Sequence, residues 1–71
     1  MEEERKDKLR EFIRRKSNEL GISEKEMANV CLATQPYFSK KLVICNFSFV
    51  ELIRLFQLLQ ASESDIKEFL L

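Results

Sequence analysis

The sequence predicts one all-α domain of five helices that spans residues 1–71. Its 71 residues are 45% apolar and 34% charged, which is the balance of a folded chain rather than a disordered one. Apolar residues recur at helical spacing over most of the length, and short polar segments with helix-capping residues separate these stretches. Only Leu42–Val50 is dense in β-branched and aromatic residues, and it lacks the regular alternation of a strand.

The first two predicted helices flank the only glycine of the chain. The first covers Glu3–Glu19. Its apolar face carries Leu9, Phe12, Ile13 and Leu20. Gly21 follows as a residue that ends a helix in the left-handed conformation. Ser23 opens the second helix and forms a capping box with Glu26, and this helix ends near Leu32.

The third predicted helix begins after a very short connection. Thr34 is a favourable N-cap, and Pro36 lies in the first turn, where its missing N–H has no helical partner to lose. Phe38 and Leu42 then share one face of the helix. About three residues, Leu32–Thr34, separate it from the second helix, and so short a turn makes the two helices cross steeply.

The fourth and fifth predicted helices carry more apolar surface than one face of a small domain needs. The fourth covers Phe49–Gln60 after an N-cap at Ser48. The fifth covers Asp65–Leu71 and has its N-cap at Ser62 or Ser64. Because a short chain has a limited core to fill, the surplus side chains predict a homodimer interface, with core filling as the alternative. These side chains are Val50, Leu55, Leu58, Phe69 and Leu70.

The composition argues against catalytic, metal-binding and membrane functions. The chain has no His and a single Gly, so it lacks the commonest acid–base group and metal ligand and any glycine-rich phosphate loop. No apolar run approaches the roughly 18 residues that span a bilayer, and the polar start at Met1–Arg5 is unlike a signal peptide. We therefore expect a cytoplasmic protein that is not an enzyme and binds no cofactor. Cys31 and Cys45 are then reduced thiols, with one disulfide in a secreted protein as the alternative.

The third helix carries the side chains with recognition chemistry. Gln35 can pair with the major-groove edge of adenine, Lys40 with that of guanine, and Ser39 with either. The hydroxyl groups of Thr34 and Tyr37 can bind phosphate. Although the formal net charge of the chain is zero, this helix contains two lysines and no acidic residue. A solvated helix face without a function is the alternative.

Two segments resemble the lambda-repressor-like, Cro-type helix-turn-helix domains of the Xre class. Ile13–Ala28 follows the first helix, glycine, Ser cap and Leu/Met-Ala pair of that family, and Thr34–Leu42 follows its recognition helix. The resemblance implies a compact five-helix domain, with a helix-turn-helix core over about residues 23–42, that binds operator DNA as a homodimer. The positions that match its base-reading residues are Gln35, Pro36, Ser39 and Lys40, and those at the backbone edge are Thr34 and Tyr37.

The chain departs from the family pattern at several positions. Leu32 stands where the family usually has Gly in the turn, so we expect a positive φ there or a rebuilt turn. Glu24 stands where a phosphate-binding Gln is common, and Pro36 replaces a polar base reader. The loop Val43–Phe47 has no basic residue. These departures favour few phosphate contacts for each monomer.

Two functions are consistent with these observations. The first is a sequence-specific transcriptional regulator of phage or bacterial type, such as a repressor, whose third helix enters the major groove of double-stranded DNA. In a dimer, two such helices would read half-sites about 34 Å apart. Gln35 and Lys40 would specify bases. The positioning residues would be Thr34, Tyr37 and Lys41. The alternative is a protein-interaction module, an antirepressor or an inhibitor of another protein, that binds its partner through Leu42–Val50.

Overall fold

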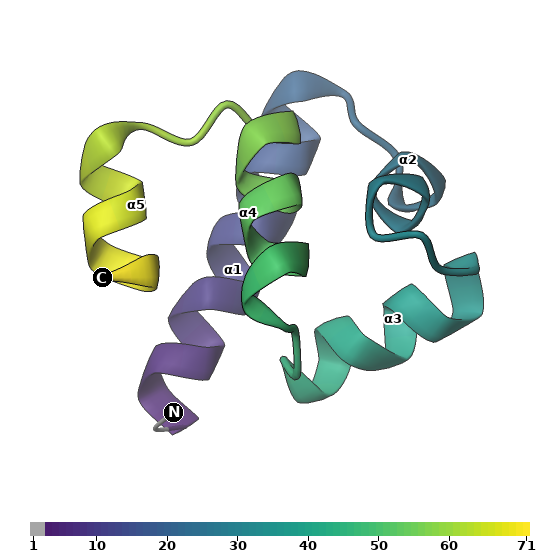
Figure 1. Cartoon of the computed structure of the whole chain (residues 1–71). Helices are drawn as coiled ribbons and strands as arrows, with labels where there is room; N and C mark the ends of the chain where they lie inside the picture. The colour runs from purple at the N-terminus through teal and green to yellow at the C-terminus, as the bar shows by residue number, and fades with distance from the viewer. Residues whose placement is uncertain (1–2) are drawn as a thin grey trace.

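The structure, a computed structural model that describes residues 3–71, contains five helices and no strand in that range (Figure 1). The helices are α1 (Glu3–Leu20), α2 (Glu24–Val30), α3 (Gln35–Ile44), α4 (Phe49–Leu58) and α5 (Glu63–Leu70). The prediction of an all-α domain with five helices is confirmed. Several boundaries differ from it by one or two residues. α3 continues past Leu42 to Ile44, α5 begins at Glu63 rather than Asp65, and α4 ends at Leu58 rather than Gln60. None of the helices in residues 3–71 is long and apolar enough to cross a membrane.

Four of the five helices begin after a Ser or Thr whose side-chain oxygen accepts a backbone N–H of the first turn. These N-caps are Ser23 of α2, Thr34 of α3, Ser48 of α4 and Ser62 of α5. At Ser48 and Ser62 the acidic side chain three residues later also accepts the N–H of the cap, which completes a capping box. Of the box predicted at Ser23, the bond from the Glu26 N–H is present. Capping satisfies donors that helices leave unpaired, so these residues set where each helix starts.

Four helices end on a residue in the left-handed conformation, and only one of these residues is glycine. They are Gly21, Leu32, Cys45 and Gln60, with φ of 67°, 56°, 53° and 54°. The residue after each donates its N–H to the carbonyl five residues earlier, at 2.8 to 3.1 Å, as in the Schellman motif. The predicted roles of Gly21 and the expected positive φ at Leu32 are confirmed. The turn between α2 and α3 therefore keeps this shape at the cost of strain in a non-glycine residue.

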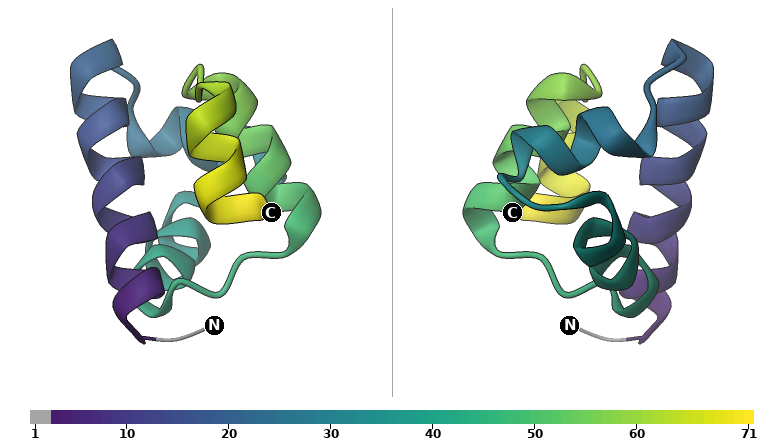
Figure 2. Two further views of the ribbon diagram at one scale, coloured as in Figure 1. Left: turned by 90° about the vertical axis from the view of Figure 1, so that its left-hand side faces the viewer. Right: turned by 90° about the vertical axis from the view of Figure 1, so that its right-hand side faces the viewer.

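The centre of the domain is formed by α1 and α4, which lie between α5 on one side and α2 and α3 on the other (Figures 1 and 2). Phe12 of α1 and Phe56 of α4 meet with their ring centroids 5.3 Å apart. The largest fully buried side chains are Leu9, Ile13, Phe38, Leu55 and Leu59. Phe38 and Leu42 are the buried residues of α3, so one face of this helix is anchored in the core.

The predicted dimer residues divide into buried and exposed ones. Leu55 is fully buried within the monomer, so its assignment to a dimer interface is wrong and it fills the core instead. Phe69 packs on two phenylalanines of α1 and α4, with centroid separations of 5.2 and 6.1 Å. Leu58 and Leu70 are also half-buried against the core, whereas Val50 is exposed. Core filling thus accounts for Leu55 fully and for three others in part.

Both cysteines are buried and unpaired. Cys31 caps the C-terminus of α2, and Cys45 follows the last residue of α3. Burial raises the pKa of the Cys31 thiol to about 11 and raises the pKa of the Cys45 thiol above its usual value. Because the thiolate is the reactive form, both residues act as small apolar core groups at neutral pH.

Candidate nucleic-acid interface

α2 and α3 form a helix pair joined by a tight turn at Cys31–Thr34. The helices cross steeply, since Figure 1 views α2 almost along its axis and α3 from the side. α2 and α3 pack against each other, α2 also packs on α4, and α3 packs on α1. The buried side chain of Phe38 holds the inner face of α3 against these helices, so the outer face is left in solvent.

The outer face of α3 carries a ridge of exposed side chains. Pro36, Lys40 and Val43 follow one another along it at helical spacing, and we call these three residues the α3 ridge. Gln35 and Tyr37 are exposed beside its N-terminal end. Val43, predicted in the loop after the third helix, instead belongs to the last turn of α3 and is 61% exposed. The ridge is therefore longer than predicted, and its far end is apolar.

The flank of α3 that faces α2 is occupied by an acidic side chain. The hydroxyl group of Ser39 donates a hydrogen bond to the carboxylate of Glu24 in the first turn of α2. Both residues are half-buried. The bond joins the two helices, and it also places a negative charge beside the α3 ridge. Ser39 is thus already bonded within the chain, and the Glu24 carboxylate opposes any phosphate that approaches this flank.

The opposite flank of α3 holds an ion pair with α4. Lys41 Nζ lies 2.8 and 2.9 Å from the two carboxylate oxygens of Glu51 and 5.1 Å from the centre of the Tyr37 ring. The N–H of Ser48 also donates to Glu51 at 2.8 Å. Burial raises the pKa of the Glu51 carboxyl, but the bonds from Lys41 and Ser48 outweigh it and lower the pKa overall. The hydrogen bond with Glu51 raises the pKa of Lys41, so both partners stay charged at neutral pH.

The C-terminal end of α3 is held by an arginine from α1. The Arg10 guanidinium donates to the backbone carbonyls of Leu42 at 3.0 Å and Val43 at 2.6 Å. Its third bond, at 2.8 Å, goes to Asp7 on its own helix. These carbonyls lie at the negative end of α3, where a cation is favourable. Arg10 therefore fixes the position of the last turn of α3 relative to α1.

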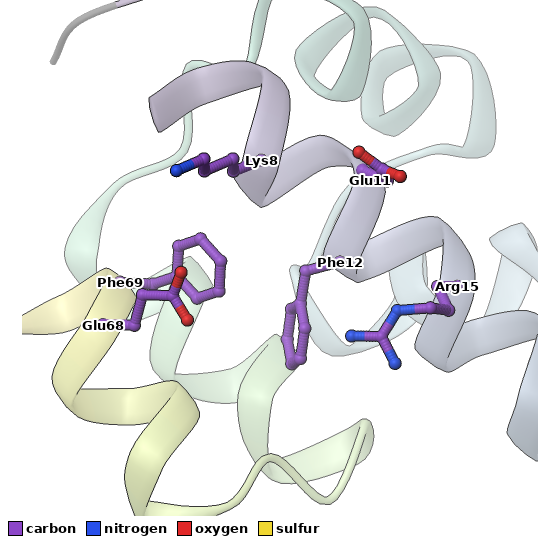
Figure 3. A pocket seen from close by; sticks show the side chains of 6 residues that line it. All are labelled: Lys8, Glu11, Phe12, Arg15, Glu68 and Phe69. Atoms are coloured by element: carbon purple, nitrogen blue, oxygen red, sulfur yellow. The ribbon is translucent and has the colours of Figure 1, made fainter. Parts of the chain in front are cut away.

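A separate hollow lies between α1 and α5 (Figure 3). Its volume is about 260 Å³, and its lining residues are Lys8, Glu11, Phe12, Arg15, Glu68 and Phe69. The two bases and two acids of the lining balance one another. The Arg15 guanidinium lies 5.8 Å from the centre of the Phe12 ring and 3.3 Å from a carboxylate oxygen of Glu19. This hollow offers no net charge to a ligand, and residues 3–71 contain no grouping of Cys, Asp and Glu suited to a metal ion.

The structure places all predicted DNA-contacting residues on or next to one helix, but it leaves only some of them unbonded. The exposed ones are Thr34, Gln35, Pro36, Tyr37 and Lys40. The Thr34 hydroxyl accepts the backbone N–H of Tyr37 at 3.4 Å. Ser39 is bonded to the carboxylate of Glu24, and Lys41 to that of Glu51. Arg10 and Glu51 hold α3 in place and were not predicted for this role. The Ser-x-x-Glu spacing of a capping box predicts Glu51 in the first turn of α4. Nothing in the sequence indicates that it pairs with Lys41.

Comparison with known proteins assigns neither a family nor a function to this chain. The chain matches no protein-family model, no curated protein and no solved structure. The resemblance to the lambda-repressor-like domains therefore stays a prediction from the residue pattern.

Proposed function

We propose that this chain is a sequence-specific DNA-binding transcriptional regulator with a lambda-repressor-like fold, and that α3 is its recognition helix. The observation that carries the proposal is the α3 ridge, which faces solvent while Phe38 anchors the opposite side of the helix. An exposed helix fits the major groove of B-DNA, which is about 12 Å wide. α2 would then cross the DNA backbone, as the first helix of such a pair does.

Gln35 and Lys40 are the base-reading residues of the proposal. Gln35 can pair with both hydrogen-bonding groups of an adenine edge, and Lys40 can donate to guanine. Both side chains are exposed, and neither forms a side-chain hydrogen bond or ion pair within residues 3–71. Thr34 and Tyr37, at the N-terminal turn of α3, would lie at the edge of the groove, where their hydroxyl groups would bond phosphate and fix the register.

Ser39 and Lys41 contribute to DNA binding only if they leave their carboxylate partners. Lys41 is paired with Glu51 at 2.8 Å, and Ser39 is bonded to Glu24. Most non-specific affinity for DNA comes from cations that replace counterions at phosphates. A monomer that keeps both bonds offers few such cations, so we expect weak binding to random sequence. If a dimer neutralises about two to four phosphates, the slope of log K against log salt is about −2 to −4.

A homodimer would double these contacts and match a two-fold operator. The groove between α4 and α5, with a volume of about 350 Å³, is lined mainly by apolar side chains, including Phe49, Ile53, Ile66 and Leu70. Val50 is exposed on the neighbouring face of α4. The domain measures 27 × 23 × 20 Å, so two adjacent copies can place their α3 helices one DNA turn, about 34 Å, apart.

A second candidate function is a protein-interaction module that keeps the fold without reading DNA. It is favoured by exposed apolar side chains at the end of α3 and the start of α4. These are Val43, Ile44, Phe49 and Val50, which are 53–61% exposed. Exposed apolar side chains near one another are typical of protein-binding surfaces. The negative charge of Glu24 beside α3 also fits a partner other than DNA.

The experiment that separates these functions compares two lysine variants of equal charge. Lys40→Ala removes the cation at the middle of the α3 ridge, whereas Lys67→Ala removes an exposed lysine of α5 that pairs with Glu63. On a duplex selected from a random pool, K40A is expected to bind at least tenfold more weakly and to lose preference at one base pair, while K67A binds as the unaltered chain does. Equal binding by the two variants would contradict the proposal.

Gln35→Ala provides a second test at a different base. It is expected to relax the preference at one position of each half-site and to leave the other positions unchanged, because it removes one bidentate contact. The measurement is a selection repeated with the variant. An unchanged selected sequence would contradict the role given to Gln35.

A further inference from the structure

The leading end of the α3 ridge is apolar. Pro36 is exposed in the first turn of α3, and Lys40 follows it one helical turn later. The Pro36 side chain has no donor or acceptor, and its backbone has no N–H. Its neighbours Gln35 and Tyr37 both carry polar groups. The start of a helix tolerates proline because the N–H there lacks a helical partner, but this does not account for the chemistry that the exposed ring presents to a ligand.

We infer that Pro36 packs against the 5-methyl group of a thymine and thereby selects thymine at one position of each half-site, an inference that rests on the proposed function. The thymine methyl is the apolar group that base edges present in the major groove. Against the other bases, the ring would cover hydrogen-bonding groups without replacing their water, which costs free energy. Pro36 therefore favours thymine by contact and disfavours the alternatives by desolvation.

The helix geometry relates this thymine to the base read by Lys40. At about 1.5 Å of rise per residue, Pro36 and Lys40 lie about 6 Å apart along the axis of α3. Successive base pairs of DNA are separated by about 3.4 Å. If α3 lies roughly along the groove, the two side chains reach bases about two pairs apart. A selected half-site is expected to contain a thymine and a guanine at about this separation.

The bonds on the two flanks of α3 help to define which face meets the bases. Ser39 is bonded to Glu24 on one flank, and Lys41 is bonded to Glu51 on the other. These pairs turn both side chains toward neighbouring helices and leave Pro36 and Lys40 on the outermost line of the helix. Because the N-terminal residues of a recognition helix contact base edges, Pro36 is the apolar residue of the ridge in the position to read a base.

The test replaces thymine by deoxyuridine, which pairs in the same way but lacks the methyl group. In a selected duplex, each thymine of one half-site is replaced in turn, and binding of the full chain is measured. One replacement is expected to weaken binding about fourfold, since burying one methyl group is worth about 0.8 kcal/mol. The variant Pro36→Ala keeps only the Cβ of the ring, so the difference between that duplex and the thymine duplex is expected to fall well below fourfold.

Leu20→Ala is the matched control, because it trims an exposed apolar side chain at the end of α1, outside the α3 ridge. It is expected to keep the fourfold effect. Equal binding of all uracil and thymine duplexes by the unaltered chain would overturn the inference and leave the proposed function standing. A fourfold effect that persists undiminished in P36A would also overturn the inference, and so would one that is lost in L20A. If no sequence is selected from the pool at all, the proposed function fails, and the inference fails with it.

Discussion

Replacing Leu32 by Gly is predicted to stabilise the domain, although loss of a leucine usually destabilises a protein. Leu32 ends α2 in the left-handed conformation with φ of 56°, and its side chain is 81% exposed. This conformation costs an L-residue roughly 1–2 kcal/mol, and Gly avoids the cost because it has no Cβ. Since the side chain is mostly in solvent, little packing is lost with it.

The variant Leu32→Ala isolates the backbone contribution. Ala also removes the exposed side chain, but it keeps the Cβ and therefore the strain. Gly gains freedom in the unfolded chain, which offsets roughly 0.4–1 kcal/mol of the benefit. L32G is therefore expected to be more stable than L32A by about 0.8 kcal/mol. For a domain of this size, that difference raises the midpoint of thermal unfolding by about 3–6 °C.

Thermal unfolding followed by circular dichroism measures this difference directly. Gln60 provides an independent repeat, because it ends α4 at φ of 54° and is also exposed. Q60G should exceed Q60A in stability by a similar amount. If L32G unfolds at a lower temperature than L32A, the left-handed residue is not strained, and the account of the turn between α2 and α3 is wrong.

Three further predictions concern the core and the contacts that hold α3. Leu55→Ala, at a fully buried position, is expected to cost about 2–5 kcal/mol in urea unfolding, whereas Val50→Ala on the exposed face of α4 should change stability by less than about 0.5 kcal/mol. The pKa of Glu51 is lowered in the folded protein. The stability that its ionised carboxylate contributes is therefore present above the usual glutamate pKa of 4.5, and it is lost as the pH falls through the folded pKa. The stability advantage of the unaltered chain over Glu51→Gln should therefore shrink below pH 4.5, and an advantage that is constant with pH would contradict the ion pair with Lys41. Arg10→Met should destabilise the protein by about 1–2 kcal/mol and speed amide exchange at the end of α3, and unchanged exchange would refute the role of its bonds to the backbone carbonyls.

The helices were predictable because local chemistry sets their limits. Ser23, Thr34, Ser48 and Ser62 each accept an N–H of the first turn, and such caps are visible in the sequence as polar residues before apolar stretches. The end of α3 was placed two residues early. Its last turn is stabilised by Arg10 from α1, a contact between residues more than 30 positions apart that no local pattern reveals.

The division between core and surface was harder to predict for the apolar side chains of α4. Helical periodicity gives α4 two apolar stripes, but it does not indicate which of the two stripes packs against a neighbouring helix. Leu55 lies in the core because α4 packs against several helices at once, while Val50 stays exposed. In the same way, the sequence predicted Ser39 and Lys41 on the third helix, but their carboxylate partners come from α2 and α4. Tertiary contacts of this kind decide which side chains remain free to bind a ligand.

The most direct test of the central claim, that α3 reads DNA, is a salt titration of binding to a random duplex pool, followed by selection of tight binders at low salt. The account predicts affinity that falls with salt at a slope of about −2 to −4 and recovery of a palindromic site whose half-sites are about 34 Å apart. The absence of binding even at low salt would contradict it. In that case the exposed apolar surface at the end of α3 and the start of α4 would be the first place to look for a protein partner.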